Sequence, residues 1–173
     1  MRKIDSIILH CSATPEGRDD SAADINRWNK DHGGIGYHYV IRLDGKVEQG
    51  RPVGQIGAHC KGHNATTIGV CYIGGLAADC KTPKDTRTPA QKTALHRLCQ
   101  SLLQQYPNAT VHGHNEFANK ACPCFDVQKE FRVPTATSNG CGGESGGIGR
   151  FNDRVAGSLC EPIAEREKKD VGL

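Results

Sequence analysis

Hydrophobic and polar positions form blocks of two different periods along the first 133 residues. Near the N-terminus, KIDSIILH is short and rich in β-branched residues, and the polar loop after it predicts a buried strand that ends there. GYHYVIRLDGKVEQGR predicts two strands joined at Asp44-Gly45, because Asp-Gly between β-rich runs favours a hairpin. TIGVCYIGG is almost continuously apolar and predicts a central strand. ATVHGH predicts one more strand.

Three segments have the pattern of a helix. SAADINRWNKDH carries Trp28 on its apolar side, and Ser21 or Asp20 is a suitable N-cap. TPAQKTALHRLCQSLLQQYP has the clearest pattern, with Thr88 as the cap, Pro89 at the first helical position and one apolar face. FDVQKEF predicts a last short helix.

The order of these elements, β-α-β-β-β-α-β-α, predicts an α/β fold: a single domain with a central mixed β-sheet flanked by helices. The chain has 173 residues and a mass of 18.7 kDa, which suits one domain with a tail. We place the domain at residues 1–133. Residues 134–173 include TATSNGCGGESGGIGR, and this Gly- and Ser-rich composition predicts a linker and tail of unknown role.

Charge and hydropathy exclude several classes of partner. The net charge is +3, from 22 Lys and Arg against 19 Asp and Glu, and the positive residues are scattered. We therefore expect no nucleic-acid partner, although the mildly basic balance suits an anionic polymer. No stretch approaches the roughly 20 apolar residues that span a bilayer, so we expect no membrane insertion. MRKIDSIILHC lacks the features of a secretion signal, which predicts a cytoplasmic protein.

The chain has nine cysteines, which is an odd number. Together with the expected cytoplasmic location, this count argues against a disulfide framework. Cys11, Cys71 and Cys99 fall in apolar segments and are predicted to be packed thiols. Reduced thiols elsewhere are available as metal ligands.

Histidines and cysteines return to one end of the predicted sheet. His10 ends the first strand, His112 and His114 lie two apart on the last strand and so face the same way, and Cys122 and Cys124 follow in a short loop. Imidazole and thiolate are preferred zinc ligands, and a catalytic zinc site has three protein ligands with an open position. The spacing fits neither a zinc finger nor a helical H-E-x-x-H site. From the residues alone, a mixed His/His/Cys site and purely structural roles both stay open.

Four blocks of the sequence together resemble a known family. ILHCSAT, GYHYVIRLDG, IGAHCKGHNATTIGVCYIGG and GHNEFANKACPCFD resemble, in this order, the signature blocks of the zinc-dependent N-acetylmuramoyl-L-alanine amidases of the amidase-2 family, especially the small phage lysozyme type. The animal peptidoglycan recognition proteins are similar to the same family. The blocks lie within residues 7–126, so residues 1–133 become the expected zinc amidase domain and the tail is not covered.

The resemblance implies which residues hold one Zn²⁺ per chain. The ligand positions fall on His10, His114 and Cys122, which puts the zinc site at one end of the sheet. His114 is preferred over His112 because the family pattern places its ligand six residues before the lysine of Lys-Ala-Cys. Cys124 stands where the family more often has a small residue, so a ligand swap or a redox pair with Cys122 is open.

The same resemblance assigns roles in catalysis and binding. Tyr37 and Lys120 match the two catalytic positions: Lys120 would stabilise the oxyanion, and Tyr37 would donate a hydrogen bond to it or handle the water proton. Without the resemblance they would be interpreted as a strand tyrosine and a surface charge. His59 and Asn64 lie in the block similar to the substrate groove and are expected to bind substrate, with structural roles as the alternative. For Glu116, general base and ligand-orienting roles stay open.

These assignments predict an enzyme that hydrolyses the amide bond between N-acetylmuramic acid and L-alanine in peptidoglycan or a muropeptide. We expect a monomer. An endolysin released to the cell wall by a separate lysis system, a recycling amidase and a delivered toxin all fit the sequence. The alternative is a peptidoglycan-binding sensor or regulatory binding protein without turnover, but the complete ligand set favours the enzyme. A regulatory protein partner stays open.

Overall fold

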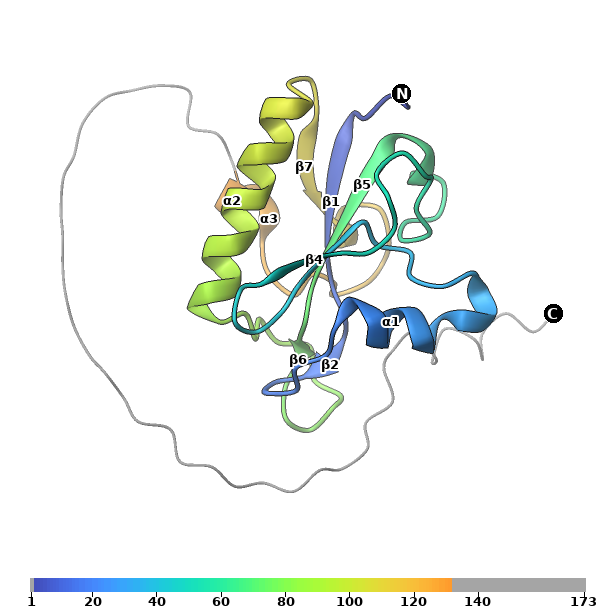
Figure 1. Ribbon diagram of the computed structural model, residues 1–173. Helices are drawn as coiled ribbons and strands as arrows, with labels where there is room; N and C mark the ends of the chain where they lie inside the picture. Colours follow the sequence, from blue (N-terminus) through green and yellow to red (C-terminus); the bar gives the residue numbers. More distant parts are fainter. Residues whose placement is uncertain (1, 132–173) are drawn as a thin grey trace, which may run out of the picture.

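A five-stranded mixed sheet forms the centre of the molecule in the computed structural model, which describes residues 2–131 (Figure 1). The strand order is β4-β3-β5-β1-β7, and only the β3–β4 pair is antiparallel. The strands are β1 (Ser6–Cys11), β3 (Tyr39–Ile41), β4 (Val47–Gln49), β5 (Thr67–Tyr72) and β7 (Thr110–Gly113). This arrangement confirms the predicted α/β domain with a mixed sheet. The predicted boundary at residue 133 and the tail 134–173 lie outside the described residues.

Helices cover both faces of the sheet, with α1 and α2 on opposite sides (Figure 1). The helices are α1 (Ala22–Trp28), α2 (Pro89–Gln105) and α3 (Val127–Phe131), and short 3₁₀ helices form η1 (Lys30–His32), η2 (Asn64–Thr66) and η3 (His114–Glu116). Ser21 and Thr88 are the N-caps of α1 and α2, and each takes part in a capping box. Within residues 2–131 no helix has the length and apolarity needed to cross a membrane.

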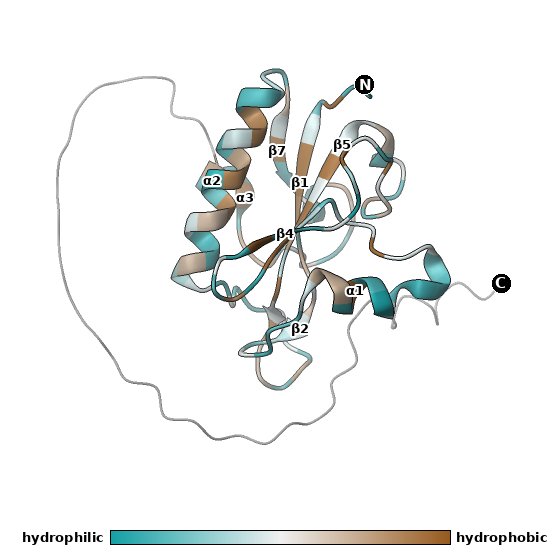
Figure 2. Ribbon diagram, viewed as in Figure 1, coloured by the Kyte–Doolittle hydropathy of each residue, from teal (hydrophilic) through white to brown (hydrophobic). Residues whose placement is uncertain are grey.

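Hydrophobic side chains fill both interfaces between sheet and helices. Ile7 and Leu9 of β1 pack in one cluster with Leu95 and Leu102 of α2. Because strand side chains alternate between faces, Ile7 and Leu9 turn away from the face on which His10 lies. Figure 2 shows hydrophobic residues concentrated on β1 and β5 and alternating with hydrophilic ones along α2. The alternation of side chains along β1 therefore places His10 on the face opposite Ile7 and Leu9.

Local signals predicted most elements correctly, and two of the differences are the end of α1 and a second small sheet. The first helix ends at Trp28, where the Asn29 side chain donates to the Ile25 carbonyl, and η1 follows instead of further α-helix. A second, two-stranded sheet joins β2 (Thr14–Pro15) to β6 (Gly75–Leu76), and no sequence pattern predicted it. A strand of two residues is too short to show a periodic pattern in the sequence. Its pairing depends on the surrounding fold.

The last strand is shorter than predicted. β7 ends at Gly113, and His114 is the first residue of η3. The prediction that His112 and His114 both lie on the strand is therefore correct for His112 and wrong for His114. The Gly113 amide donates to the Glu116 carboxylate at 2.6 Å, and this bond turns the chain into η3. The turn gives the two histidines different surroundings.

Candidate metal centre

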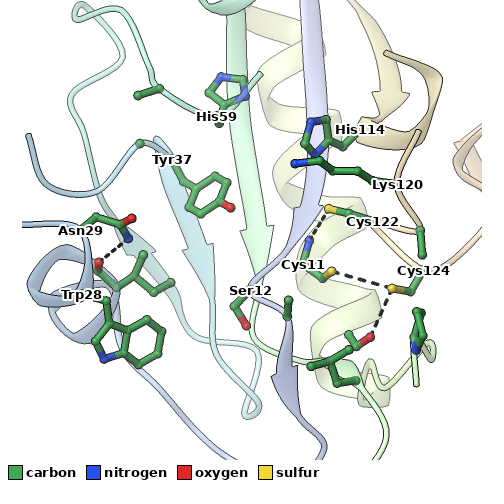
Figure 3. A pocket seen from close by; sticks show the side chains of 18 of the residues that line it. Cys11, Ser12, Trp28, Asn29, Tyr37, His59, His114, Lys120, Cys122 and Cys124 are labelled. Atoms are coloured by element: carbon green, nitrogen blue, oxygen red, sulfur yellow. Dashed lines mark hydrogen bonds between the residues drawn. The ribbon is translucent and has the colours of Figure 1, made fainter. Parts of the chain in front are cut away.

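His10, His114 and Cys122 meet at one end of the sheet, although they come from a strand, a 3₁₀ helix and a loop. Their ligand atoms all lie within 4.8 Å of one another. The Sγ atom of Cys122 is 3.8 Å from Nδ1 of His10. Figure 3 shows the Cys122 sulfur beneath the His114 ring, on one wall of a cavity. The sequence placed these three residues at one site, and the structure brings them together.

His10 lies on the central strand β1 and is held at this site as a neutral imidazole. β1 pairs with β5 so that His10 stands opposite Cys71, and the histidine is only 1% exposed. Burial lowers the pKa of His10 well below its usual value, and the charges of neighbouring His59, His114 and Lys120 lower it further. Neutral imidazole is the form that binds a metal ion.

Hydrogen bonds from three segments hold the loop that carries Cys122. The Tyr72 hydroxyl donates to the Pro123 carbonyl at 2.7 Å, and the Asn115 amide donates to the Cys122 carbonyl at 2.8 Å. The Cys11 amide donates to the Cys122 sulfur at 3.2 Å. These bonds fix the loop so that the Cys122 sulfur faces His10.

The donor set fits zinc in composition and spacing. Zinc binds sulfur at about 2.3 Å and histidine nitrogen at about 2.0–2.1 Å, so a tetrahedral site has a sulfur–nitrogen edge of about 3.6 Å. The 3.8 Å between Cys122 and His10 is close to that value. Three protein ligands are also the number found in catalytic zinc sites, which keep one position for water or substrate.

His112 and Glu116 stand beside this cluster without belonging to it. Nδ1 of His112 lies 2.8 Å from the Glu116 carboxylate, and Nε2 lies 2.8 Å from the Thr110 hydroxyl. Glu116 also accepts from the Gly113 amide, directly before His114. Neither His112 nor Glu116 is among the described residues that line the cavity at the cluster. The geometry therefore connects Glu116 to the backbone that precedes a ligand.

A cavity of about 720 Å³ opens beside the cluster. Tyr37, His59 and Lys120 line it together with His114 and Cys122. Figure 3 shows the Tyr37 hydroxyl directed into the cavity and the Lys120 amino group beside the His114 ring. Burial raises the pKa of Tyr37 well above its usual value, so its hydroxyl keeps its proton at neutral pH.

The two residues expected to bind substrate lie in different surroundings. His59 lines the cavity but is only 8% exposed. The Asn64 side-chain oxygen accepts from the amides of His59 and Cys60, at 2.9 and 3.0 Å, and so braces their loop. Within residues 2–131, Asn64 is not among those that line the cavity. Substrate contact by His59 and Asn64 stays a prediction.

The structure pairs Cys124 with Cys11, a contact that sequence reasoning missed. Their sulfur atoms are 3.8 Å apart, and Cys124 donates to the Gly75 carbonyl at 3.2 Å. The interaction with Cys122 raises the pKa of Cys11, the interaction with Cys11 raises that of Cys124, and burial raises both pKa values, which keeps both residues as thiols. The described cysteines that are free thiols are Cys11, Cys60, Cys71, Cys99, Cys122 and Cys124.

The far end of the cavity was also missed. Trp28, Leu76 and Pro83 line it, together with Ile25 of α1. The available signal was Trp28, the single tryptophan, but its helical spacing indicated only the apolar side of α1. Leu76 belongs to the short β2–β6 sheet, which had no sequence signal.

Comparisons with known proteins agree with the geometry of the site. A family model described as N-acetylmuramoyl-L-alanine amidase matches residues 1–125. The endolysin of Klebsiella phage KP32 is 43% identical over 125 residues, which cover 71% of this chain and 82% of the endolysin. The endolysin of Escherichia phage T7 is 42% identical over 128 residues, covering 72% and 83%.

A solved structure of the same description has a similar fold. The N-acetylmuramoyl-L-alanine amidase LysC from Clostridium intestinale URNW is 26% identical and superposes with a TM-score of 0.63, covering 76% of this chain and 87% of LysC. The matched residues 1–125 contain the three residues of the cluster and also Tyr37 and Lys120. The chain belongs to the N-acetylmuramoyl-L-alanine amidase family.

Proposed function

We propose that this chain hydrolyses the amide bond between N-acetylmuramic acid and L-alanine with one zinc ion held by His10, His114 and Cys122. The observation that carries the proposal is the convergence of these three ligand atoms within 4.8 Å, beside a cavity that Tyr37 and Lys120 line together with two of the three ligands. When bound, zinc supplies a Lewis acid and lowers the pKa of a water molecule to about 7.

The chain's own residues would then act on the substrate carbonyl. Amide hydrolysis passes through a tetrahedral intermediate with a negative oxygen, and a positioned cation or hydrogen-bond donor stabilises that oxygen. Lys120 supplies a cation at the cavity wall, and Tyr37 supplies a hydroxyl that burial keeps protonated. A proton donor and a cation on the same cavity favour turnover over binding alone, which supports the enzyme over the sensor.

The size of the cavity is evidence for a large, polymeric substrate. The cavity extends from the cluster to Trp28 (Figure 3), so it has room for groups on both sides of a scissile bond. Peptidoglycan and its soluble fragments present a sugar on one side and a stem peptide on the other. We infer that the wall-bound polymer is the substrate, in line with the endolysin relatives, and that a separate lysis system releases the protein from the cytoplasm to the cell wall.

Removal of the metal tests the proposal. The purified chain should contain one zinc ion, lose amidase activity after dialysis against a chelator, and regain it when zinc is added back. Cys122→Ser should lose both zinc and activity, because a hydroxyl replaces the thiolate. Cys60→Ser is the matched control, since Cys60 is a free thiol that does not line the cavity. Full activity in the chelated protein would refute the zinc site.

A further inference from the structure

A second histidine touches the ligand His10 on the side away from Cys122. Nε2 of His10 lies 3.1 Å from Nδ1 of His59, while Nδ1 of His10 is the atom that faces the Cys122 sulfur. The two rings cross nearly at right angles, at 82°, and both residues are buried. A hydrogen bond between the rings is therefore shielded from water.

The hydrogen-bond partners assign the proton positions along this contact. The Thr67 hydroxyl donates to the His63 carbonyl at 2.8 Å, so it has only acceptor capacity left for Nε2 of His59 at 3.4 Å. Nε2 of His59 then carries the proton, and its Nδ1 is an acceptor. Nε2–H of His10 donates to that acceptor, which leaves the lone pair of Nδ1 of His10 directed toward the metal position.

The fold reserves space for the His59 ring. A Cβ atom on Gly69 of β5 would lie 2.5 Å from the ring, and one on Gly57 would lie 2.6 Å from it. Real Cβ atoms do not approach so closely, so any other residue at either position would displace the ring. The His38 ring packs across His59 with centroids 5.7 Å apart. These contacts fix the place of His59 as well as its hydrogen bonds.

We propose that His59 is a positioning residue that fixes the tautomer and orientation of His10, with Thr67 fixing His59 in turn. The proposal rests on the proposed zinc site and gives His59 a role other than the expected substrate contact. Both ring nitrogens of His59 already have protein partners, so its ring offers the substrate no polar atom. Partners of this kind behind a ligand histidine typically change metal affinity by about 10–100-fold.

Zinc affinity, measured by competition with a chromophoric chelator, tests the proposal in the full-length protein. His59→Phe keeps a ring but removes the acceptor, and it should weaken zinc binding about 10–100-fold. His59→Gln can accept from His10 and donate to Thr67, so it should recover part of that loss. Thr67→Val leaves His59 in place but frees its tautomer, and it should weaken zinc binding by a smaller factor. The absorption spectrum of the cobalt-substituted protein should shift in His59→Phe and Thr67→Val.

A substrate-contact role predicts the opposite pattern and would overturn the proposal: zinc affinity and cobalt spectrum unchanged, with a raised KM at constant kcat. His63→Gln is the matched control, because His63 is an exposed residue of the same loop and its side chain does not line the cavity. If His59→Phe does not fold, Thr67→Val and His59→Gln still decide the result. A wild-type protein that binds no zinc refutes the zinc site itself, whereas a zinc-binding wild type with unaffected variants refutes only the role of His59.

Discussion

His10 and His114 illustrate how surroundings select the chemical form of a residue. Burial lowers the pKa values of both histidines, and the nearby Lys120 lowers them further. Burial is thus the main reason that both histidines stay neutral; Lys120 adds to it, and in the proposed function the same lysine supplies the cation at the cavity wall.

Replacement of Lys120 separates these two effects. Lys120→Ala should retain stoichiometric zinc, because lysine is not one of the three ligands, and should lower kcat about 10²–10³-fold through loss of oxyanion stabilisation. Zinc content and steady-state kinetics on purified peptidoglycan measure the two quantities. Lys129→Ala, on the exposed side of α3, is the matched control. Normal turnover in Lys120→Ala would show that another group stabilises the oxyanion.

At the scale of elements, the buried side chain of Arg87 holds α3 against the rest of the domain. The Arg87 side chain is 2% exposed and pairs with Asp85 at 2.9 Å and with Glu130 of α3 at 2.8 Å. Its guanidinium also lies 3.2 Å from the centre of the Phe125 ring. Phe125 follows the Cys-Pro-Cys loop directly, so the same arginine connects the metal-site loop, α3 and the segment before α2.

Removal of the arginine charge should destabilise the whole domain. Arg87→Met keeps most of the side-chain volume but removes the guanidinium that Asp85 and Glu130 share, leaving them only Lys92 and His96. We expect a loss of about 2–3 kcal/mol in the free energy of unfolding, reduced by the partial exposure of the two carboxylates. Urea unfolding of the zinc-free protein measures it. Arg27→Met, at an exposed ion pair on α1, should change the free energy by less than about 1 kcal/mol. An equal effect of both variants would contradict this account of Arg87.

The same cluster predicts a loss of stability in acid. Burial alone would raise the pKa values of Asp85 and Glu130, but the bonds to Arg87 outweigh burial and lower both. The unfolded chain therefore binds more protons, so the contribution is present above about pH 4, the usual carboxyl range, and is lost as the pH falls below it. Unfolding free energies between pH 6 and 3 should fall less steeply in Asp85→Asn/Glu130→Gln than in the wild type. Identical slopes would contradict the assignment.

Elements with strong local signals were predicted from the sequence, and those that depend on distant contacts were not. Thr88 and Pro89 determine the start of α2, and Asp44-Gly45 the β3–β4 hairpin, because caps and turns act within a few residues. The β2–β6 pair depends on neighbours brought close by the fold, and the end of β7 depends on a local bond from the Gly113 amide to the Glu116 side chain that the strand pattern does not show. His114 lies in the cluster with His10 and Cys122 even though its predicted element was wrong, because the family resemblance concerns residues and not strands.

At the scale of the molecule, the site is assembled from segments spread over most of the domain. His10, Tyr37, His59 and Cys122 line or adjoin one cavity although more than a hundred residues separate the first from the last. The sequence could predict the family and the convergence of three candidate ligands, because residue types and signature blocks are visible in it. It could not predict the extent of the cavity, which depends on how α1 and the β2–β6 sheet pack around its far end.

The domain proposed for residues 1–133 should therefore function alone. Every described element and every candidate site residue lies within it, so a chain without residues 134–173 should bind zinc and cleave peptidoglycan with unchanged kcat/KM. Zinc content, urea unfolding and turnover of the shortened chain, compared with those of the full chain, measure this. Aggregation or loss of zinc in the shortened chain would mean that the tail contributes to the fold.

The products released from purified peptidoglycan test the central claim most directly. The zinc-loaded protein should release stem peptides with a free L-alanine amino group, identified by mass spectrometry, and should leave the lactyl group of N-acetylmuramic acid on the glycan. A chelator should abolish the release. Products that instead carry a newly formed reducing sugar end, or binding to the polymer without any release by the zinc-loaded protein, would contradict the account.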